Sequence, residues 1–146
     1  MQLSAYSDYA IRVLMQTALR GPERTTVAEV AETYGISRHH LVKVVHDLGR
    51  AGYLATQRGI GGGFTLARTP EEIRLGDIVR LGEESETVID CHEDGNRVCR
   101  LLPACRLKGV LDEAAAAFFE VLDRYTLADL MRRPSRMRTV LGIGST

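Results

Sequence analysis

Three cysteines, Cys91, Cys99 and Cys105, have the clearest capacity for chemistry in this sequence. They fall within fifteen residues, and their odd number argues against a disulfide framework. The intervening gaps of seven and five residues lack the Cys-x-x-Cys pairs of a zinc ribbon or a redox motif. Three thiolates on an irregular loop suit an iron–sulfur cluster that leaves one iron site for another ligand. Reduced cysteines with a structural or incidental role are the alternative that spacing alone leaves open.

The charged residues around the cysteines bear on the same question. Arg97, Arg100, Arg106 and Lys108 lie close in sequence and would favour thiolates and an anionic cluster. A cysteine-nucleophile enzyme is not indicated, because no recognisable motif supplies a His or Asp partner. The sequence therefore predicts a protein that is not an enzyme. A zinc-stabilised or metal-free interaction module stays open as a further alternative.

Residues 25–51 carry the pattern of two short helices joined by a tight turn. Thr26 is a suitable cap for the first helix, Gly35 ends it, and Ser37 is a suitable cap for the second. The apolar set is Val27, Val30, Ala31, Ile36, Leu41, Val44, Val45 and Leu48. This arrangement is typical of a helix-turn-helix, although an ordinary helical hairpin has the same local pattern.

The next segment favours the DNA-binding alternative. Residues 53–67 give two short strands around the glycine-rich loop RGIGGG, which bears Arg58. A hairpin directly after a helix-turn-helix is a wing, and Arg58 at its tip could reach phosphate or a narrow minor groove. A nucleotide-phosphate loop is disfavoured, since no GK[ST] follows and the glycines lead into a strand.

The distribution of charge agrees with one polyanion-binding face. The chain has no net charge, yet residues 1–68 carry eight Lys/Arg against five Asp/Glu, a net charge of +3. Residues 69–146 carry the compensating −3, with an acidic stretch at 83–94. Taken with the helix-turn-helix and the hairpin, the sequence predicts a fold that is mainly α with a small β wing, a winged helix-turn-helix to which a long dimerisation helix is added.

The remaining elements follow from apolar periodicity and caps. Residues 7–20 predict a helix capped by Ser7, and residues 73–81 predict a short strand and a helical turn. A long helix begins at about Arg106, Thr126 caps a short helix, and Pro134 begins a loose tail. The long helix has a heptad-like seam that favours self-association, formed by Leu107, Leu111, Ala114, Phe118, Val121 and Tyr125.

Length and composition bound the organisation. The 146 residues, 45% of them hydrophobic and without Trp, suit one compact domain with an appendage. We expect a DNA-binding domain at 1–82, a cluster-binding loop and dimerisation helix at 83–133, and a flexible tail at 134–146. No apolar run is long enough to cross a membrane, and the first residues lack a secretory signal pattern. A cytoplasmic protein without membrane association is the expectation.

Five stretches carry a resemblance to a known family. They are SDYAIRVLM, YGISRHHLVKVVHDLGRAGYL, RLGDIVR, PACRLKGVL and DRYTLADLM, and with RGIGGGFTLAR they extend over nearly the whole chain to about residue 131. The chain resembles the Rrf-type winged-helix regulators, most of all their nitric-oxide-sensing repressors. Iron-responsive members have similar cysteine spacing, so an iron- or cluster-supply-responsive repressor is the alternative within the family.

The resemblance implies a 4Fe–4S cluster in each subunit, held by Cys91, Cys99 and Cys105 and completed by an aspartate of the partner subunit. The matching aspartate is Asp8, which by sequence alone is a helix-start carboxylate. His92 is a rival fourth ligand, as are Asp90 and Glu93, because these residues lie in the loop itself. The resemblance further implies that nitric oxide displaces ligands of the cluster and releases the operator.

The DNA-binding residues follow from the recognition helix and the wing. We expect a homodimer that places two recognition helices in successive major grooves of palindromic double-stranded DNA. Arg38 and His39 are assigned to base edges, and Lys43, Arg50 and Arg58 to phosphates or the wing contact. Ser37 and His40 lie at the same exposed helix start, although His40 or His46 could instead pack on the rear of the helix.

Overall fold

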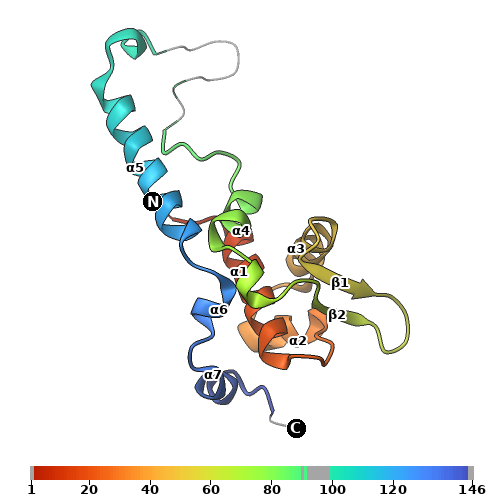
Figure 1. The fold of residues 1–146 in the computed structure, drawn as a ribbon. Coiled ribbons are helices and arrows are strands. Elements are labelled where there is room, and N and C mark those ends of the chain that lie inside the picture. The colour runs from red at the N-terminus through yellow and green to blue at the C-terminus, as the bar shows by residue number, and fades with distance from the viewer. Residues whose placement is uncertain (1, 90, 92–98, 145–146) are drawn as a thin grey trace.

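The computed structural model describes residues 2–89, 91 and 99–144. The elements in chain order are α1 (Ala5–Arg20), α2 (Val27–Tyr34), α3 (Arg38–Arg50), β1 (Leu54–Gln57), β2 (Gly63–Leu66), η1 (Pro70–Glu72), α4 (Leu75–Gly82), η2 (Leu102–Ala104), α5 (Arg106–Asp123), α6 (Leu127–Leu130) and α7 (Pro134–Leu141). The body contains α1 to α4, with the β1–β2 hairpin projecting from one side and α5 from another (Figure 1). The expected fold class, mainly helical with a small β wing, is confirmed.

Helix α1 forms the centre of the body. Ala10, Val13, Leu14 and Thr17 recur at steps of three and four residues and are almost completely buried. They meet the buried faces of the surrounding elements, whose contributions include Val30, Leu41, Val44, Leu48, Phe64, Ile73, Ile78 and Leu127. The helix expected over residues 7–20 from apolar periodicity is therefore confirmed.

The start of α1 differs from the prediction. The helix begins at Ala5, and its N-cap is Ser4, whose side chain accepts a hydrogen bond from the Ser7 backbone N–H. Ser7 lies inside the first turn and is fully buried. Its hydroxyl is directed to α4 instead, so the assignment of Ser7 as the cap was wrong.

The helix-turn-helix has the local chemistry that the sequence predicts. Thr26 and Glu29 form a reciprocal capping box at the start of α2. Gly35 ends α2 in the left-handed region, with φ of 65°, where a residue without Cβ has no steric penalty. Ser37 precedes α3 at the expected position but makes no side-chain capping bond. These caps fix the two ends of α2, and the short turn after Gly35 leads directly into α3.

The wing is a two-stranded antiparallel hairpin in which Leu54 pairs with Leu66 and Gln57 with Gly63. A bridge between Thr25 and Phe64, with N···O distances of 2.9 and 2.8 Å, attaches it to the start of the helix-turn-helix. At Gly63 a Cβ would stand 2.6 Å from the Thr25 carbonyl oxygen, so this close approach requires glycine.

The segment after the wing corrects a second prediction. The structure gives residues 70–72 as a short 3-10 helix and Leu75–Gly82 as α4, with only an isolated bridge between Arg74 and Thr126. The strand expected near Ile73 was therefore wrong, whereas the helical turn extends into α4. Backbone hydrogen bonds from this segment to Tyr125, which follows α5, and to Leu127, the first residue of α6, take the place of a strand ladder. The Leu127 N–H donates to the Ile73 carbonyl oxygen at 2.8 Å.

The long helix begins at Arg106, as predicted, and the capping box at Thr126 starts α6. The loose tail expected from Pro134 was wrong for residues 134–141, which form α7. Proline is well suited to the first turn of a helix, because its missing N–H has no partner there. Arg138 Nε donates to the Leu19 carbonyl oxygen at 2.9 Å and joins α7 to the end of α1.

Candidate DNA-binding face and cysteine segment

The recognition helix α3 exposes the residues that the sequence assigns to DNA. Leu41, Val44, Val45 and Leu48 are buried against the body. The exposed residues include Ser37, Arg38, His39, His40, Lys43 and Arg50. Such a helix presents donors and positive charge at its start, as major-groove binding requires.

The histidines of α3 differ in their surroundings. The His40 ring remains exposed and stacks with Tyr9 of α1 at a centroid distance of 6.3 Å. His46 is 60% exposed, with Nδ1 3.4 Å from an Asp47 oxygen. His40 therefore packs in part on α1, as the rear-packing alternative allows, whereas that alternative fails for His46.

Lys43 is engaged within the protein. Its ammonium lies 3.0 Å from Asp47 Oδ2 and 5.1 Å from the centre of the Tyr6 ring. The Lys43 hydrogen bond lowers the pKa of Asp47 despite some burial, so the carboxylate stays ionised. With 74% of its side chain exposed, Lys43 can still turn to a phosphate, but this requires exchange of its partner.

The wing tip has a defined shape. Arg58 is exposed at the tip, and Ile60 beside it is fully exposed. Arg24 Nη1 donates a hydrogen bond to the Gly61 carbonyl oxygen at 2.6 Å, which fixes the wing loop to the segment before α2. A Cβ on Gly62 would come within 2.7 Å of two carbonyl oxygens of the hairpin. Arg24 was missed by sequence reasoning, because nothing local links it to a loop 37 residues away.

The three cysteines are all free, with Cys91 and Cys105 half-buried and Cys99 exposed. Cys105 is the N-cap of α5, and its Sγ accepts from the Lys108 N–H at 3.4 Å. The pKa of Lys108 is raised, mainly by its hydrogen bond to Asp112 and to a lesser extent by the charges of Cys91 and Cys105. Cys105 therefore lies at a helix start, where the backbone N–H groups favour a negatively charged group.

The predicted ligands do not converge in a single subunit. Across residues 2–89, 91 and 99–144, no three His, Cys, Asp or Glu side chains gather closely enough to hold a metal ion. The rival ligands His92, Asp90 and Glu93 lie outside the described residues. The donor set itself, three thiols and a carboxylate, fits an iron–sulfur cluster chemically.

Asp8 lies on α1 with its side chain 45% exposed. Both carboxylate oxygens stand 2.9 Å from Arg12 Nε, and the Arg12 guanidinium lies 5.3 Å from the centre of the Tyr34 ring. The spacing of four residues makes this ion pair readable from the sequence, although our interpretation did not include it. Asp8 is therefore partly exposed to solvent, with Arg12 as its ion-pair partner.

Helix α5 packs on its own subunit by a narrow face. Ala115 and Phe119 are buried, and the Arg80 guanidinium of α4 lies 4.6 Å from the centre of the Phe119 ring. Several residues elsewhere on the helix are apolar and exposed, including Leu107 at 60%, Val110 at 53% and Val121 at 43%. Residues of the heptad-like seam are thus left largely uncovered by the subunit itself.

Comparison with known proteins decides the family. The Rrf2 family model, described as an iron-dependent transcriptional regulator, matches residues 3–133. The chain belongs to the Rrf2 family. The resemblance to Rrf-type regulators, and to their NsrR members in particular, is thereby confirmed. The HTH-type transcriptional regulator NsrR of Shouchella clausii is 42% identical over all of this chain and 99% of its own. NsrR of Bacillus subtilis is also 42% identical, over 97% of each chain.

Solved structures agree on the fold. CymR, the global cysteine regulator of B. subtilis, superposes with a TM-score of 0.70 at 30% identity, covering 89% of this chain and 95% of its own. IscR of T. potens gives a TM-score of 0.71 at 28% identity, covering 90% and 87%. This Rrf2 chain is therefore a DNA-binding transcriptional regulator with a winged helix-turn-helix. In the part of the chain that the structure describes, no helix is both long and apolar enough to span a membrane.

Proposed function

We propose that this Rrf2 protein is a homodimeric cytoplasmic repressor that carries a 4Fe–4S cluster and senses nitric oxide. The observation that carries the proposal is a set of three free cysteines in one segment directly before α5, in a chain 42% identical to NsrR proteins. In the proposed division, residues 1–82 read DNA and residues 83–133 hold the cluster and form the dimer.

Cys91, Cys99 and Cys105 of one subunit would hold the cluster together with Asp8 of the partner subunit. When bound, the cluster supplies iron sites that take up nitric oxide. Oxygen is a harder donor than thiolate, so the carboxylate is the weakest of the four ligands. Arg12 holds the same carboxylate within the subunit and competes with its ligand role. Asp8 therefore has two alternative partners, as a switch residue requires.

The dimer is proposed to form through α5. Its buried face is occupied by α4, and its exposed apolar residues would pack against the same residues of a second copy around a two-fold axis. A two-fold dimer matches a palindromic operator, with half-sites about one helical turn apart. Release of Asp8 from the cysteine segment of the other subunit would remove a cross-subunit tie and loosen the spacing of the two recognition helices.

The roles at DNA follow from exposure on α3 and the wing. Arg38 and His39 are proposed to contact base edges, with Ser37 and His40 beside them. Lys43, Arg50 and Arg58 are proposed to contact phosphates or, at the wing, the minor groove.

The decisive experiment is anaerobic purification with absorbance, iron and sulfide assays, followed by nitric oxide titration while binding to a palindromic operator is monitored by fluorescence anisotropy. We expect about four irons and four sulfides per subunit and loss of operator binding as nitric oxide is added. Cys105→Ala is the matched control and should lack a stable cluster. A zinc-containing or metal-free protein would contradict the proposal.

An iron- or cluster-supply-responsive repressor is the second candidate, favoured by the description of the family model as iron-dependent. The same titration separates the two. Operator binding that responds to iron chelation and cluster loss but not to nitric oxide would replace the first candidate with the second.

A further inference from the structure

The first turn of α1 is bonded to the residue at which the chain leaves α4 for the cysteine segment. Glu83, the C-cap of α4, accepts a hydrogen bond from the Ser7 hydroxyl at 2.6 Å and from the Ser4 N–H at 2.9 Å. The Ser4 hydroxyl donates to the Gly82 carbonyl oxygen at 3.0 Å. Three bonds between segments more than seventy residues apart thus fix the start of α1 to the end of α4.

The same turn is bonded to the recognition helix. The Tyr6 hydroxyl donates to Asp47 Oδ2 of α3 at 3.1 Å. Burial, reinforced by the charge of Asp47, raises the pKa of Tyr6 to about 12, so the hydroxyl keeps its proton and remains a donor. Asp47 accepts from Lys43 through the same oxygen. The position of Tyr6 therefore bears directly on a residue assigned to DNA phosphate.

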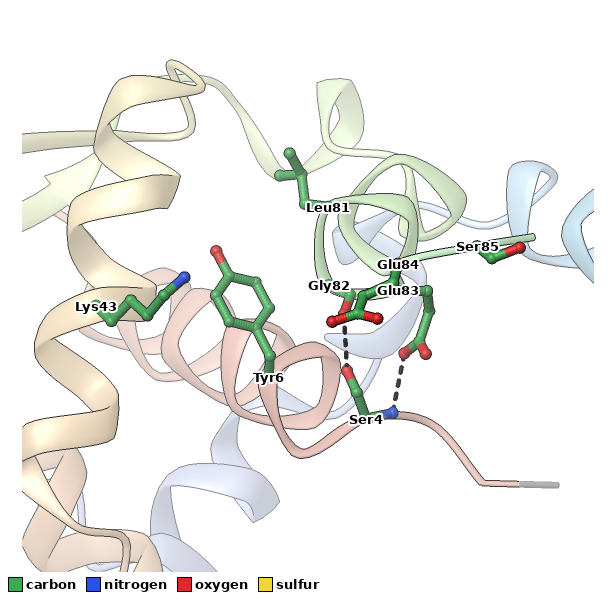
Figure 2. Close-up of a pocket in the computed structure, with 8 residues that line it drawn as sticks. All are labelled: Ser4, Tyr6, Lys43, Leu81, Gly82, Glu83, Glu84 and Ser85. Carbon is green, nitrogen blue, oxygen red and sulfur yellow. Dashed lines mark hydrogen bonds between the residues drawn. The ribbon is translucent and has the colours of Figure 1, made fainter. Parts of the chain in front are cut away.

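These two ties converge in one place (Figure 2). Tyr6 and Lys43 face one another on one side of a cavity of about 640 Å³, and Ser4 with Gly82 and Glu83 forms another side. The contact between α1 and α4 has no spare room, since a Cβ on Gly82 would lie 2.7 Å from Tyr6 Cδ1 and 2.9 Å from the Ser7 nitrogen. A shift of α4 toward α1 must therefore displace the first turn of α1, and a shift away from it must break the hydrogen bonds of Ser4 and Ser7.

Helix α4 is held to the long helix as firmly. Arg80 forms two hydrogen bonds with Asp123 of α5, at 2.6 and 2.9 Å. At Gly76 a Cβ would stand 2.9 Å from Asp123 Cγ, so the two helices approach closely there as well. Movement of α5 or of the chain beyond Glu83 is thus transmitted to α4 by direct contact.

We propose that the first turn of α1 couples the segment beginning at Glu83 to the recognition helix, with Ser7 and Glu83 as positioning residues on one side and Tyr6 and Asp47 on the other. The coupling rests on the proposed function, because it is the presence or loss of the cluster in the cysteine segment that would change the position of Glu83. Ser7 and Tyr6 are adjacent and project about 100° apart around the helix, so one turn contacts both neighbours at once. Loss of the Tyr6 bond frees Asp47 to hold Lys43 away from DNA.

The test compares operator binding by cluster-loaded and cluster-free protein. Tyr6→Phe removes only the hydroxyl, and Tyr53→Phe, a hydroxyl deletion elsewhere in the core, is its matched control. We expect Tyr6→Phe to reduce the ratio of the two dissociation constants about fivefold or more, the range in which couplings between sites usually fall. Tyr53→Phe should leave the ratio at the wild-type value. A purely structural role would change both dissociation constants together and leave their ratio intact, which would overturn the coupling.

A second measurement uses cluster-free protein and so does not depend on the cluster. Glu83→Ala should increase amide hydrogen exchange in α3, whereas Glu84→Ala, the same change of charge at the next residue, should not. In a Tyr6→Phe background Glu83→Ala should add no further increase. Equal increments in the two backgrounds would show that Glu83 does not act through Tyr6. A wild-type protein whose operator affinity is the same with and without cluster would instead contradict the proposed function, and the exchange measurement would still decide the coupling.

Discussion

Two adjacent phenylalanines on α5 should have separate roles, because they differ in burial although their rings meet edge to face at a centroid distance of 5.3 Å. Phe119 is 5% exposed, lies under the Arg80 guanidinium and packs against α4 within its own subunit. Phe118 is only half-buried and belongs to the heptad-like seam. Truncating a buried phenylalanine to alanine costs about 3–5 kcal/mol, from lost transfer free energy and the cavity left behind. A domain of this kind has a total stability of about 5–15 kcal/mol, so Phe119→Ala removes a large part of it.

The expected result is a fall of about 10 °C in the melting temperature of Phe119→Ala, given about 2–4 °C per kcal/mol for a chain of this length. The folded fraction should remain dimeric. Phe118→Glu should keep most of the intrinsic stability of the subunit but place a charge in an apolar interface, at a cost of several kcal/mol to association.

Thermal melts at several protein concentrations, combined with sedimentation velocity, separate these effects, because only dimer dissociation makes the melt depend on concentration. Phe118→Glu should sediment as a monomer at low micromolar concentration. A Phe118→Glu protein that stays dimeric there, or a Phe119→Ala protein with an unchanged melt, would refute the assignment of faces on α5.

The remaining predictions concern DNA, cluster and acid. Arg58→Ala should weaken binding to operator and random duplexes alike and reduce the slope of log K against log salt by about one. Arg38→Ala should cost about 1–3 kcal/mol of binding free energy on the operator alone. Equal losses on both duplexes for both variants would contradict the assignment of Arg58 to phosphate and Arg38 to bases. Asp8→Ala should still assemble a cluster anaerobically, with an altered circular dichroism spectrum and faster loss of the cluster in air, whereas Cys105→Ala should bind little cluster. An unchanged spectrum and cluster lifetime in Asp8→Ala would mean that Asp8 is only a helix-start carboxylate and not a ligand. Burial would raise the pKa of Glu83, but hydrogen bonds from Ser7 and Ser4 outweigh burial and hold this pKa below its usual range. The contribution of Glu83 to stability is therefore full above the pKa of the unfolded chain and is lost as pH falls through the lowered pKa of the folded protein. Glu83→Gln should flatten this acid limb in a series of urea-unfolding measurements, and an identical limb would contradict the role.

Sequence alone determined the parts of this protein that depend on near neighbours in the chain. The Thr26 cap, the end of α2 at Gly35 and the glycine-rich hairpin depend on local sequence, and each occurs where predicted. The buried stripe of α1 follows from a period of 3.6 residues that any helix imposes. The grouping of three cysteines is likewise a property of the chain itself.

Other features were decided only when distant segments met. Ser4 and Ser7 are equally good caps by type, and the choice between them depends on Glu83, which takes the Ser7 hydroxyl from 76 residues away. The bond from Tyr6 to Asp47 joins residues 41 positions apart. No periodicity or cap signals such a pair, because side-chain hydrogen bonds between elements depend on how helices cross.

The tertiary structure also decided which faces are used. Apolar periodicity identifies a heptad-like seam on α5 but does not say which apolar residues of the helix are buried within the chain. Packing against α4 buries Ala115 and Phe119 and leaves the seam residues Leu107 and Val121 exposed. The segment near Ile73, expected as a strand, is instead bonded to the start of α6, since the backbone partner of Ile73 is Leu127, 54 residues away, and not a residue of a neighbouring strand. Local sequence preference determined where most helices and strands of this regulator form, and contact between these elements determined which of their faces are buried and which are exposed.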